Sequence, residues 1–186
     1  MKNIPGINEI KAINGEFDLG KLQKDYSSLS EREISHNKIV PSLEEAVKLC
    51  GLKDGQTISF HHHFRGGDYI VNMVMDALAA MGFKDLVLAA SSLADCHAPL
   101  IKHIKSGVIR RIETSGLRGK LADEISGGLM EIPVVFRSHG GRAYAIETGE
   151  LPIDVAFLGA PSCDPFGNAN GYSRDNNAGV KCGSMG

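Results

Sequence analysis

The chain has 186 residues, of which 42% are hydrophobic and 23% are charged, and its formal net charge is −2. This length and composition are sufficient for one globular domain with a well-buried core. The near-balanced charge, the scattered Lys and Arg residues and the absence of a long apolar run exclude a nucleic-acid-binding surface and a membrane span.

Cysteine usage and the amino-terminal sequence indicate the compartment. The first residues contain no apolar stretch of signal-peptide length, and the four cysteines stand apart from one another at positions 50, 96, 163 and 182. Dispersed cysteines of this kind fit reduced thiols better than a disulfide framework. We therefore expect a cytoplasmic protein.

The first half of the chain changes character near Pro41. Residues 1–40 are polar and mixed, which predicts an arm or peripheral segment, whereas residues 41–186 read as an α/β domain. Ser42 is a candidate cap for a helix over residues 43–49 that ends at Gly51. A strand is expected over residues 57–60, followed by a helix over residues 70–81 with Asp68 as its cap and Gly82 as its stop.

The second half repeats this alternation. The run at residues 86–90 is apolar on both faces, as in a strand covered by helices on both sides of a parallel sheet. Further on we expect helices over residues 99–104 and 120–130, strands over 108–114, 133–136 and 153–160, and turns over 166–171. The alternation predicts an α/β fold with an open, largely parallel sheet flanked by helices.

Polar side chains and glycines follow the predicted strands. Ligands of such sheets bind beyond the carboxyl ends of the strands, so these residues should meet at one edge. A glycine pair there allows a close backbone approach to an anion, and arginine neutralises it. The candidate binding residues are His61, His62, His63, Arg65, Gly66, Gly67, Ser91, Ser92, Ser115, Gly116, Arg118, Arg137, Gly140 and Gly141.

The three consecutive histidines admit several interpretations. An expression tag would stand at a terminus, and this run is internal. On a strand His61 and His63 would share one face, and no further ligand spacing completes a zinc site, so we expect no metal. Histidines bonded to backbone at a strand end and histidines that contact a substrate remain open.

Common catalytic motifs are missing. The chain has no dinucleotide fingerprint, no phosphate loop and no nucleophile elbow. The triplet of Asp95, Cys96 and His97 suggests a thiol nucleophile, but neighbours in sequence need not touch, and an inert cysteine is the preferred interpretation.

Four longer motifs resemble a known family. They are GQTISFHHHFRGGDYIVNMVMD at residues 55–76, DCHAPL at 95–100, TSGLRGKL at 114–121 and DVAFLGAPSCDPFGNANG at 154–171. In these residues the chain closely resembles the α subunit of bacterial citrate lyase, which belongs to the CoA-transferase group. The resemblance runs almost end to end and implies an open α/β fold, which sugar-phosphate isomerases share.

The resemblance implies a function and partners. The subunit would exchange the acetyl group of acetyl-acyl-carrier protein for citrate, giving the citryl thioester and acetate. No cofactor would bind directly, because the thioester is on the carrier's phosphoribosyl-dephospho-CoA arm. A β subunit and the acyl carrier, or γ, subunit would complete an oligomeric complex. Gly66 and Gly67 would then form an oxyanion hole, and Arg65, Arg118, Arg137 and Arg142 would be candidates to neutralise carboxylates or phosphates.

The chain also departs from the family. Citrate lyase α subunits are longer, which leads us to expect an amino-terminal portion that lacks a second domain and is inactive alone. Many CoA transferases use a glutamate nucleophile, but nothing assigns that role to Glu113, Glu124 or Glu147, so the catalytic residue is unknown. The alternatives are a CoA transferase acting on free acyl-CoA through a glutamyl thioester, a sugar-phosphate isomerase and a non-catalytic assembly module.

Overall fold

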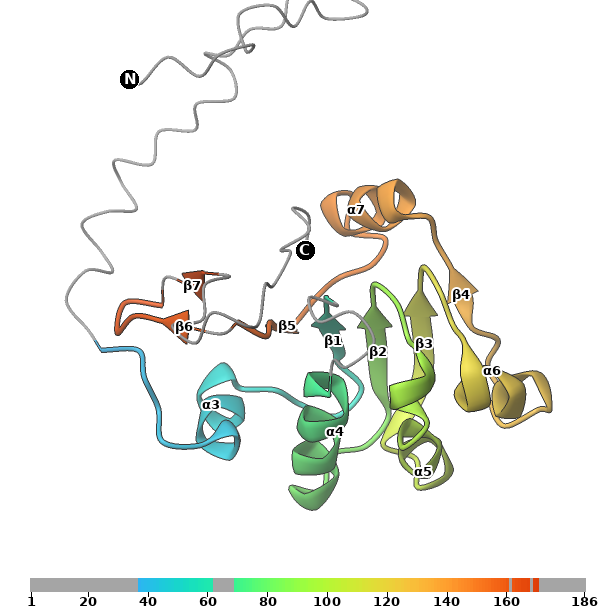
Figure 1. Ribbon diagram of the computed structural model, residues 1–186, viewed down its shortest axis with the longest axis horizontal. Helices are drawn as coiled ribbons and strands as arrows, with labels where there is room; N and C mark the ends of the chain where they lie inside the picture. Colours follow the sequence, from blue (N-terminus) through green and yellow to red (C-terminus); the bar gives the residue numbers. More distant parts are fainter. Residues whose placement is uncertain (1–36, 62–68, 161, 168, 171–186) are drawn as a thin grey trace, which may run out of the picture. The chain divides into compact units, whose positions relative to one another are not determined.

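Every neighbouring pair of strands in the main sheet is parallel (Figure 1). The structure is a computed structural model and describes residues 37–61, 69–160, 162–167 and 169–170. Within these residues five strands form the sheet in the order β4-β3-β2-β1-β5. The strands are β1 (Thr57–Phe60), β2 (Leu86–Ala90), β3 (Ile109–Thr114), β4 (Val135–Phe136) and β5 (Val155–Phe157). The predicted open, parallel α/β sheet is confirmed.

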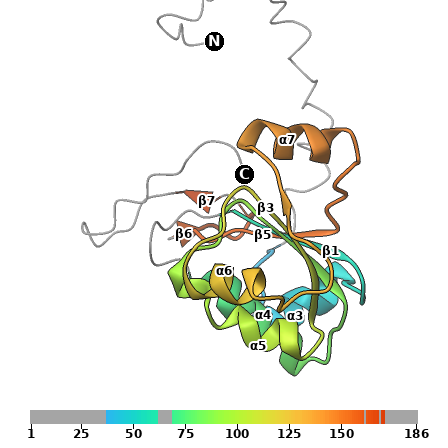
Figure 2. The ribbon, with the colours of Figure 1, turned by 90° about the vertical axis from the view of Figure 1, so that its right-hand side faces the viewer.

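The helices divide unequally between the two faces of the sheet (Figure 2). One face carries α3 (Leu43–Cys50), α4 (Ile70–Ala80), α5 (Leu100–Lys105) and α6 (Gly119–Ser126), and the other carries α7 (His139–Glu147). Right-handed crossovers explain this division. The chain steps from β1 to β4 in one direction, which places the connecting helices on one face. It then returns to the far side of β1, which places α7 on the opposite face.

The main core lies between the sheet and the four-helix layer. Ile58, Leu88 and Ile112 are register partners across β1, β2 and β3, and all three are fully buried. From α4, Met75 and Leu78 pack against the same core. Burial of each such side chain contributes about 1.5–3 kcal/mol. The α7 face has a much smaller apolar cluster, formed by Ala89, Ala145 and Leu151 with Ile153 beside it.

Helix ends follow the sequence signals with two exceptions. Ser42 Oγ accepts a hydrogen bond from the Glu45 amide at the start of α3, as its predicted cap. At the start of α4 the cap position is Tyr69, whose side chain makes no capping bond, and the predicted cap, Asp68, lies outside the described residues. The predicted helix over residues 120–130 ends already at Ser126, because two glycines follow it.

The two outer strands are shorter than predicted, and both contain an exposed residue. The expected buried strand over residues 153–160 is reduced to β5, in which Ala156 is exposed, and the one over 133–136 is reduced to β4, in which Phe136 is exposed. Each lies at an edge of the sheet and is covered on fewer sides than a central strand. The Asp154 carboxylate secures β5 by accepting hydrogen bonds from the Thr57 amide at 2.7 Å and the Gln56 side chain at 3.0 Å.

A two-stranded antiparallel hairpin follows the sheet in sequence. It consists of β6 (Ser162–Cys163) and β7 (Ala169–Asn170), and β7 lies within the segment over residues 166–171 that was predicted to form turns. At its turn, Asp164 Oδ1 accepts a hydrogen bond from the Phe166 amide at 2.9 Å. Among the helices of the described residues, none has the length and apolar character needed to cross a bilayer.

A buried histidine links α5 to α4 and makes stability depend on pH. His103 Nε2 lies 2.7 Å from Asp76 Oδ1, which also pairs with Lys102 at 2.7 Å. Burial lowers the pKa of His103 below its ordinary value of 6.5, although Asp76 opposes this. The unfolded chain therefore takes up a proton more readily, so stability is complete above pH 6.5 and falls as the pH drops below it.

We expect His103→Gln to flatten this dependence, because glutamine can still donate to Asp76 but cannot titrate. The measurement is urea unfolding of both proteins at pH 7.5, 6.5 and 5.5. The wild type should lose more free energy of unfolding than the variant between the first and last pH. Parallel losses in the two proteins would show that His103 does not govern this pH range.

Candidate functional site

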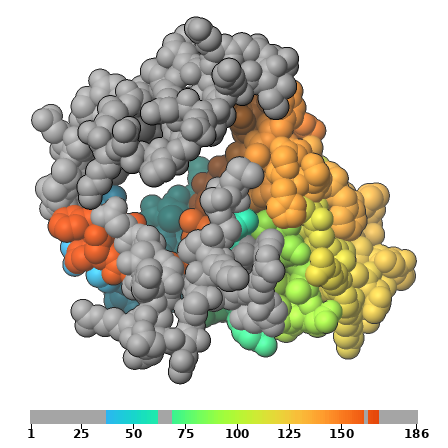
Figure 3. Space-filling view, turned by 45° about the horizontal axis from the view of Figure 1, so that its top comes forward, coloured from blue at the N-terminus to red at the C-terminus, as the bar shows by residue number. Residues whose placement is uncertain are grey.

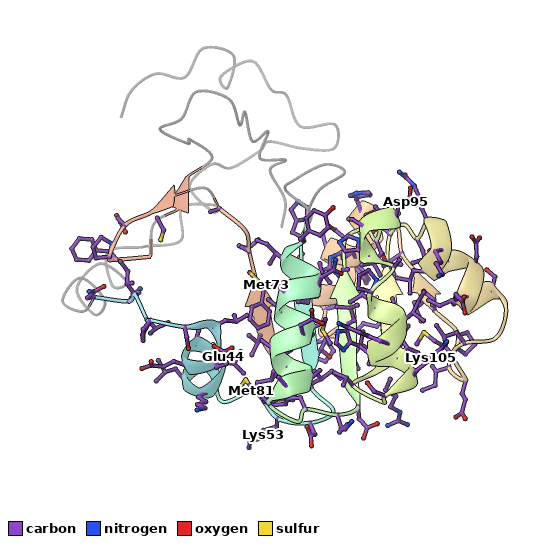
Figure 4. The ribbon with its side chains drawn as sticks, turned by 60° about the horizontal axis from the view of Figure 1, so that its bottom comes forward. Glu44, Lys53, Met73, Met81, Asp95 and Lys105 are labelled. Carbon is purple, nitrogen blue, oxygen red and sulfur yellow. The ribbon has the colours of Figure 1, made fainter. Side chains whose placement is uncertain are left out.

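The carboxyl ends of the parallel strands form one edge of the sheet, at the top of Figure 1. Asp95, in the short helix η2 (Asp95–His97) after β2, lies toward this edge, whereas Lys53 and Lys105 lie toward the opposite one (Figure 4). The strand order reverses between β1 and β5, which is where ligands bind in open α/β sheets. α7 is exposed at the surface when this edge is turned forward (Figure 3). The carboxyl edge is therefore the candidate site.

The segments at the carboxyl ends of β2 and β3, residues 91–97 and 114–119, are hydrogen-bonded to each other. We call them the paired loops. The Leu93 amide donates to Gly116 O at 2.8 Å, the Arg118 amide donates to Leu93 O at 3.1 Å, and the Ser115 amide donates to Ser91 O at 3.3 Å. These bonds continue the parallel pairing of β2 with β3 beyond the strands. The paired loops are thus a fixed platform at the carboxyl edge.

Two glycines allow the paired loops to approach each other closely. A Cβ atom on Gly116 would lie 3.2 Å from Ser92 Oγ. At Gly119 φ is +65°, and a Cβ atom there would overlap the Asp95 carboxylate. The loop over residues 115–119 therefore owes its shape to contacts with the neighbouring loop as well as to its own turn.

One serine of the platform has an unused hydroxyl. Ser115 Oγ is buried and has no hydrogen-bond partner among the described residues, whereas the neighbouring Thr114 hydroxyl donates to Gly116 O at 2.9 Å. A buried hydroxyl without a partner is costly, and a ligand atom can supply that partner. Ser91 is buried beside it, at 2% exposure, and Ser92 is half-buried.

Cys96 and His97 do touch in space. His97 Nε2 lies 3.7 Å from Cys96 Sγ, while His97 Nδ1 accepts a hydrogen bond from the Ala94 amide at 2.8 Å. An Nδ1 atom that accepts must be unprotonated, so in the neutral ring the proton is on Nε2, facing the sulfur. To take a proton from the thiol, His97 would have to lose the Ala94 bond. This arrangement favours the inert thiol over a nucleophile.

The sequence reading did not single out Asn72, which supports the first of the paired loops. Its Nδ2 donates to Cys96 O at 2.7 Å, and its buried Oδ1 has no partner in the part of the chain that the structure describes. The carbonyl fixes the orientation of the amide, because only the NH₂ end can donate to it. A polar residue in the first turn of an apolar helix was the signal that could have identified it.

A buried carboxylate lies on the α7 face of the sheet. Glu113 is 2% exposed; its carboxylate forms an ion pair with Arg111 Nη2 at 2.6 Å and accepts a hydrogen bond from Arg137 Nε at 2.9 Å. Arg137 also pairs with Glu150 at 3.0 Å. These two carboxylates raise the pKa of Arg137. Arg137, predicted to bind an anion, is thus already neutralised within the fold.

The glycines after β4 lie in a helix, α7, which was not predicted from the sequence. Ser138 caps α7 by accepting a hydrogen bond from the Gly141 amide at 3.0 Å, so Gly140 and Gly141 belong to the first helical turn. Arg142, one residue further, extends from α7 to the sheet. Its Nη2 donates to Ser59 Oγ at 2.7 Å and to Ala89 O at 3.3 Å.

The structure brings together part of the predicted site. Ser91, Ser92, Ser115, Gly116 and Arg118 all lie on the paired loops, and Arg118 is exposed without an ion-pair partner among the described residues. His61 follows the last residue of β1 and is half-buried. The remaining predicted residues, His62, His63, Arg65, Gly66 and Gly67, lie outside the described residues.

The structure also shows where possible metal ligands and the glutamates Glu124 and Glu147 lie. Within the part of the chain that the structure describes, no three His, Cys, Asp or Glu residues are grouped so as to hold a metal ion. Glu147 is exposed in the last turn of α7. Glu124 lines an open depression at the end of α6 together with Asp123, Gly127, Gly128 and Leu129.

The fold and the edge together define a class: an open, parallel α/β protein with a polar, arginine-bearing candidate site at the carboxyl ends of its strands. Comparison with known proteins narrows this class. The family model described as "Citrate lyase, alpha subunit (CitF)" matches residues 36–186. The chain belongs to the citrate lyase α subunit family.

Individual relatives agree with this assignment. The chain is 57% identical over 172 residues to the citrate lyase alpha chain of Escherichia coli K12, covering 92% of this chain and 33% of the relative. It is 63% identical over 157 residues to that of Klebsiella pneumoniae, covering 84% and 30%. A crystal structure described as a citrate lyase α subunit from Streptococcus mutans in complex with citrate matches with a TM-score of 0.75 and 56% identity, covering 82% and 29%. The chain spans about a third of the length of these relatives.

Proposed function

We propose that the chain contributes the first half of the active site of a citrate:acetyl-acyl-carrier-protein transferase, in the cytoplasm. In this reaction citrate replaces acetate on the carrier's phosphoribosyl-dephospho-CoA arm. The β subunit and the carrier subunit would be its partners, and no other cofactor would be needed. The observation that carries the proposal is the platform of paired loops, with its unpartnered Ser115 hydroxyl, in a member of the citrate lyase α subunit family.

The described residues can divide the work of binding a tricarboxylate. Ser115 can donate its hydroxyl hydrogen to a ligand oxygen, and Arg118 supplies an exposed positive charge three residues further along the same loop. His61 follows β1 at the point where the strand order reverses. In this proposal Gly66 and Gly67 supply amide groups to the oxygen of the reacting thioester.

The test is acyl exchange with a chimaera. In the full-length Klebsiella α chain, the matching amino-terminal segment is replaced by this chain, which the 63% identity makes practicable. Acetylated carrier protein and labelled citrate are supplied, and citryl carrier and released acetate are measured. We expect the chimaera to be active and its Ser115→Ala variant to be about 10-fold less active, since a lost hydrogen bond costs about 1–1.5 kcal/mol.

The unmodified Klebsiella chain is the positive control, and this chain alone shows what the first third can do. A folded but inactive chimaera beside an active control would contradict the proposal. If the chimaera then exchanged acyl groups between free CoA thioesters and formed an adduct that hydroxylamine cleaves, a transferase with a glutamyl intermediate would take its place. Glu113 would not be its nucleophile, because both carboxylate oxygens already bind arginines.

The assembly-module alternative is favoured by one observation on α4. Tyr69 and Met73 are 62% and 58% exposed, and Figure 4 shows Met73 on the outer surface of the helix. Apolar side chains of this size at the surface suit a partner-binding role. The assembly module would be favoured by two results together: Met73→Ser loses binding of the carrier or the β subunit, and the chimaera shows no acyl exchange.

A further inference from the structure

Three arginines reach the α7 face of the sheet, and they differ in how their charges are compensated. Arg111 and Arg137 both contact the Glu113 carboxylate, and Arg137 contacts Glu150 as well. The two hydrogen bonds of Arg142 go to neutral oxygens, Ser59 Oγ and Ala89 O. Arg142 therefore differs from the other two in having no carboxylate in contact among the described residues.

The position of Arg142 makes that difference costly. The side chain is half-buried, and burial lowers its pKa. The more distant Glu113 charge acts in the opposite direction but does not cancel this effect. A partly desolvated cation is unfavourable unless an anion or several hydrogen bonds replace the lost water. Serine and a backbone carbonyl replace only part of it, and they leave the cation without a counter-charge in contact.

The guanidinium also has donors to spare. It carries five N–H groups, and both hydrogen bonds in the structure come from Nη2. The Nε hydrogen and the two Nη1 hydrogens have no partner among the described residues. Because Nη2 is held against the sheet, these donors are fixed in place. They can donate hydrogen bonds to a carboxylate without a large loss of side-chain entropy.

The fold places this group beside the candidate site. Ser59, the anchor of Arg142, lies in β1 two residues before His61, and its register partners are Ala89 in β2 and Ala156 in β5. Arg142 therefore lies over the carboxyl half of β1, where the strand order reverses. Glu113 in β3 is the register partner of Ala89, and it pairs with Arg137. Arg137 therefore secures the segment before α7, while Arg142 remains available for a ligand.

We propose that Arg142 binds one carboxylate of the tricarboxylate substrate, as a cation that the fold holds in readiness for an anion. The inference rests on the proposed function and adds to it a specific anchor, which replaces Arg137 in that role. A phosphate of the carrier arm presents similar oxygens, so the test must separate the two sources. We assign the carboxylate, because the site lies on the sheet beside β1, next to the loops proposed to hold citrate.

The experiment is an NMR titration of this chain with citrate, and in a second arm with inorganic phosphate. The chain has no Trp, so intrinsic indole fluorescence cannot report binding. The side-chain Nε–H signal of Arg142, assigned by its absence in Arg142→Gln, should shift with citrate and remain in place with equimolar phosphate. Citrate should bind Arg142→Gln about 10- to 100-fold more weakly than wild type, the range for a lost charge-assisted bond. Arg142→Lys should fall between the two.

Two matched variants control for charge. Arg110→Gln removes an equal charge from an exposed position of β3 and should leave citrate binding unchanged. Arg137→Gln should lower the melting temperature and change citrate affinity little, because the role of Arg137 is to hold Glu113 and Glu150. Thermal unfolding of each variant shows whether it folds. If Arg142→Gln does not fold, the wild-type Nε–H shift and the Arg142→Lys affinity decide.

The outcomes separate the inference from the proposed function. A citrate-dependent shift of other residues without any at Arg142, or equal citrate affinity in wild type and Arg142→Gln, would overturn the inference and leave the transferase in place. A response to phosphate in preference to citrate would overturn the carboxylate assignment. Absence of any citrate-dependent shift would also overturn the inference. The proposed transferase activity would then be tested separately by acyl exchange with the chimaera.

Discussion

Gly119→Ala is expected to lower the free energy of unfolding by roughly 2–4 kcal/mol, because backbone strain of about 1–2 kcal/mol adds to the cost of displacing a packed neighbour. The strain follows from the φ of +65°. The displacement follows because the new Cβ atom would overlap the Asp95 carboxylate and lie 3.1 Å from Asp95 Cα. Urea unfolding monitored by circular dichroism measures the loss.

Gly149→Ala is the matched control for this prediction. Its φ is +78°, but a Cβ atom there would meet nothing within 4 Å, so only the backbone strain should remain. Asp95→Ala in the Gly119→Ala background should recover part of the loss by removing the overlapping carboxylate. Equal losses for Gly119→Ala and Gly149→Ala would mean that the paired loops do not press against each other as described.

Glu113→Ala should also be strongly destabilising, by about 3 kcal/mol, the low end of the range for breaking a buried ion pair. The Glu113 side chain is 3% exposed, and its removal leaves Arg111 without its carboxylate. We take the low end because Arg111 is 41% exposed and can regain water. Chemical denaturation gives the value, and α7 should also become more accessible to proteases because Arg137 loses one of its two partners.

Glu150→Ala provides the comparison. This carboxylate is 57% exposed, and exposed ion pairs contribute about 0–1 kcal/mol. If Glu150→Ala lost as much free energy of unfolding as Glu113→Ala, the network would owe its strength to the pairing of Arg137, before α7, with Glu150, after α7. Burial of Glu113 would then not be the main source of stability.

The alternation of strands and helices was most predictable where a central strand is an apolar run bounded by glycine or polar residues. β2 is the clearest case, since residues 86–90 are apolar throughout and the strand has the same bounds in the structure, Leu86–Ala90. Edge strands were less predictable. Their limits depend on how much of a neighbour covers them, and the apolar run at residues 153–160 does not carry that information.

Helix α7 could not be recognised by apolar periodicity. Ala145 is its one fully buried residue in the structure, and the helix begins with a glycine pair that usually marks a loop. Ser138 was the available signal, because serine is a favoured helix cap. The site was predictable only as a set of loop residues. The bonds that order it connect loops about 24 residues apart, such as Leu93 with Gly116, and the different roles of Arg137 and Arg142 depend on partners distant in sequence.

The pairing of β1 with β5 has a consequence for how the chain is made. Ile58 is the register partner of Val155, and the Thr57 amide bonds to the Asp154 side chain 97 residues away. During synthesis β2 can pair with β1 early, but the other side of β1 stays open until β5 has left the ribosome. The strand that leads into the candidate site therefore keeps one open edge from the synthesis of β1 until that of β5, and an open strand edge can pair with a chaperone or with another chain.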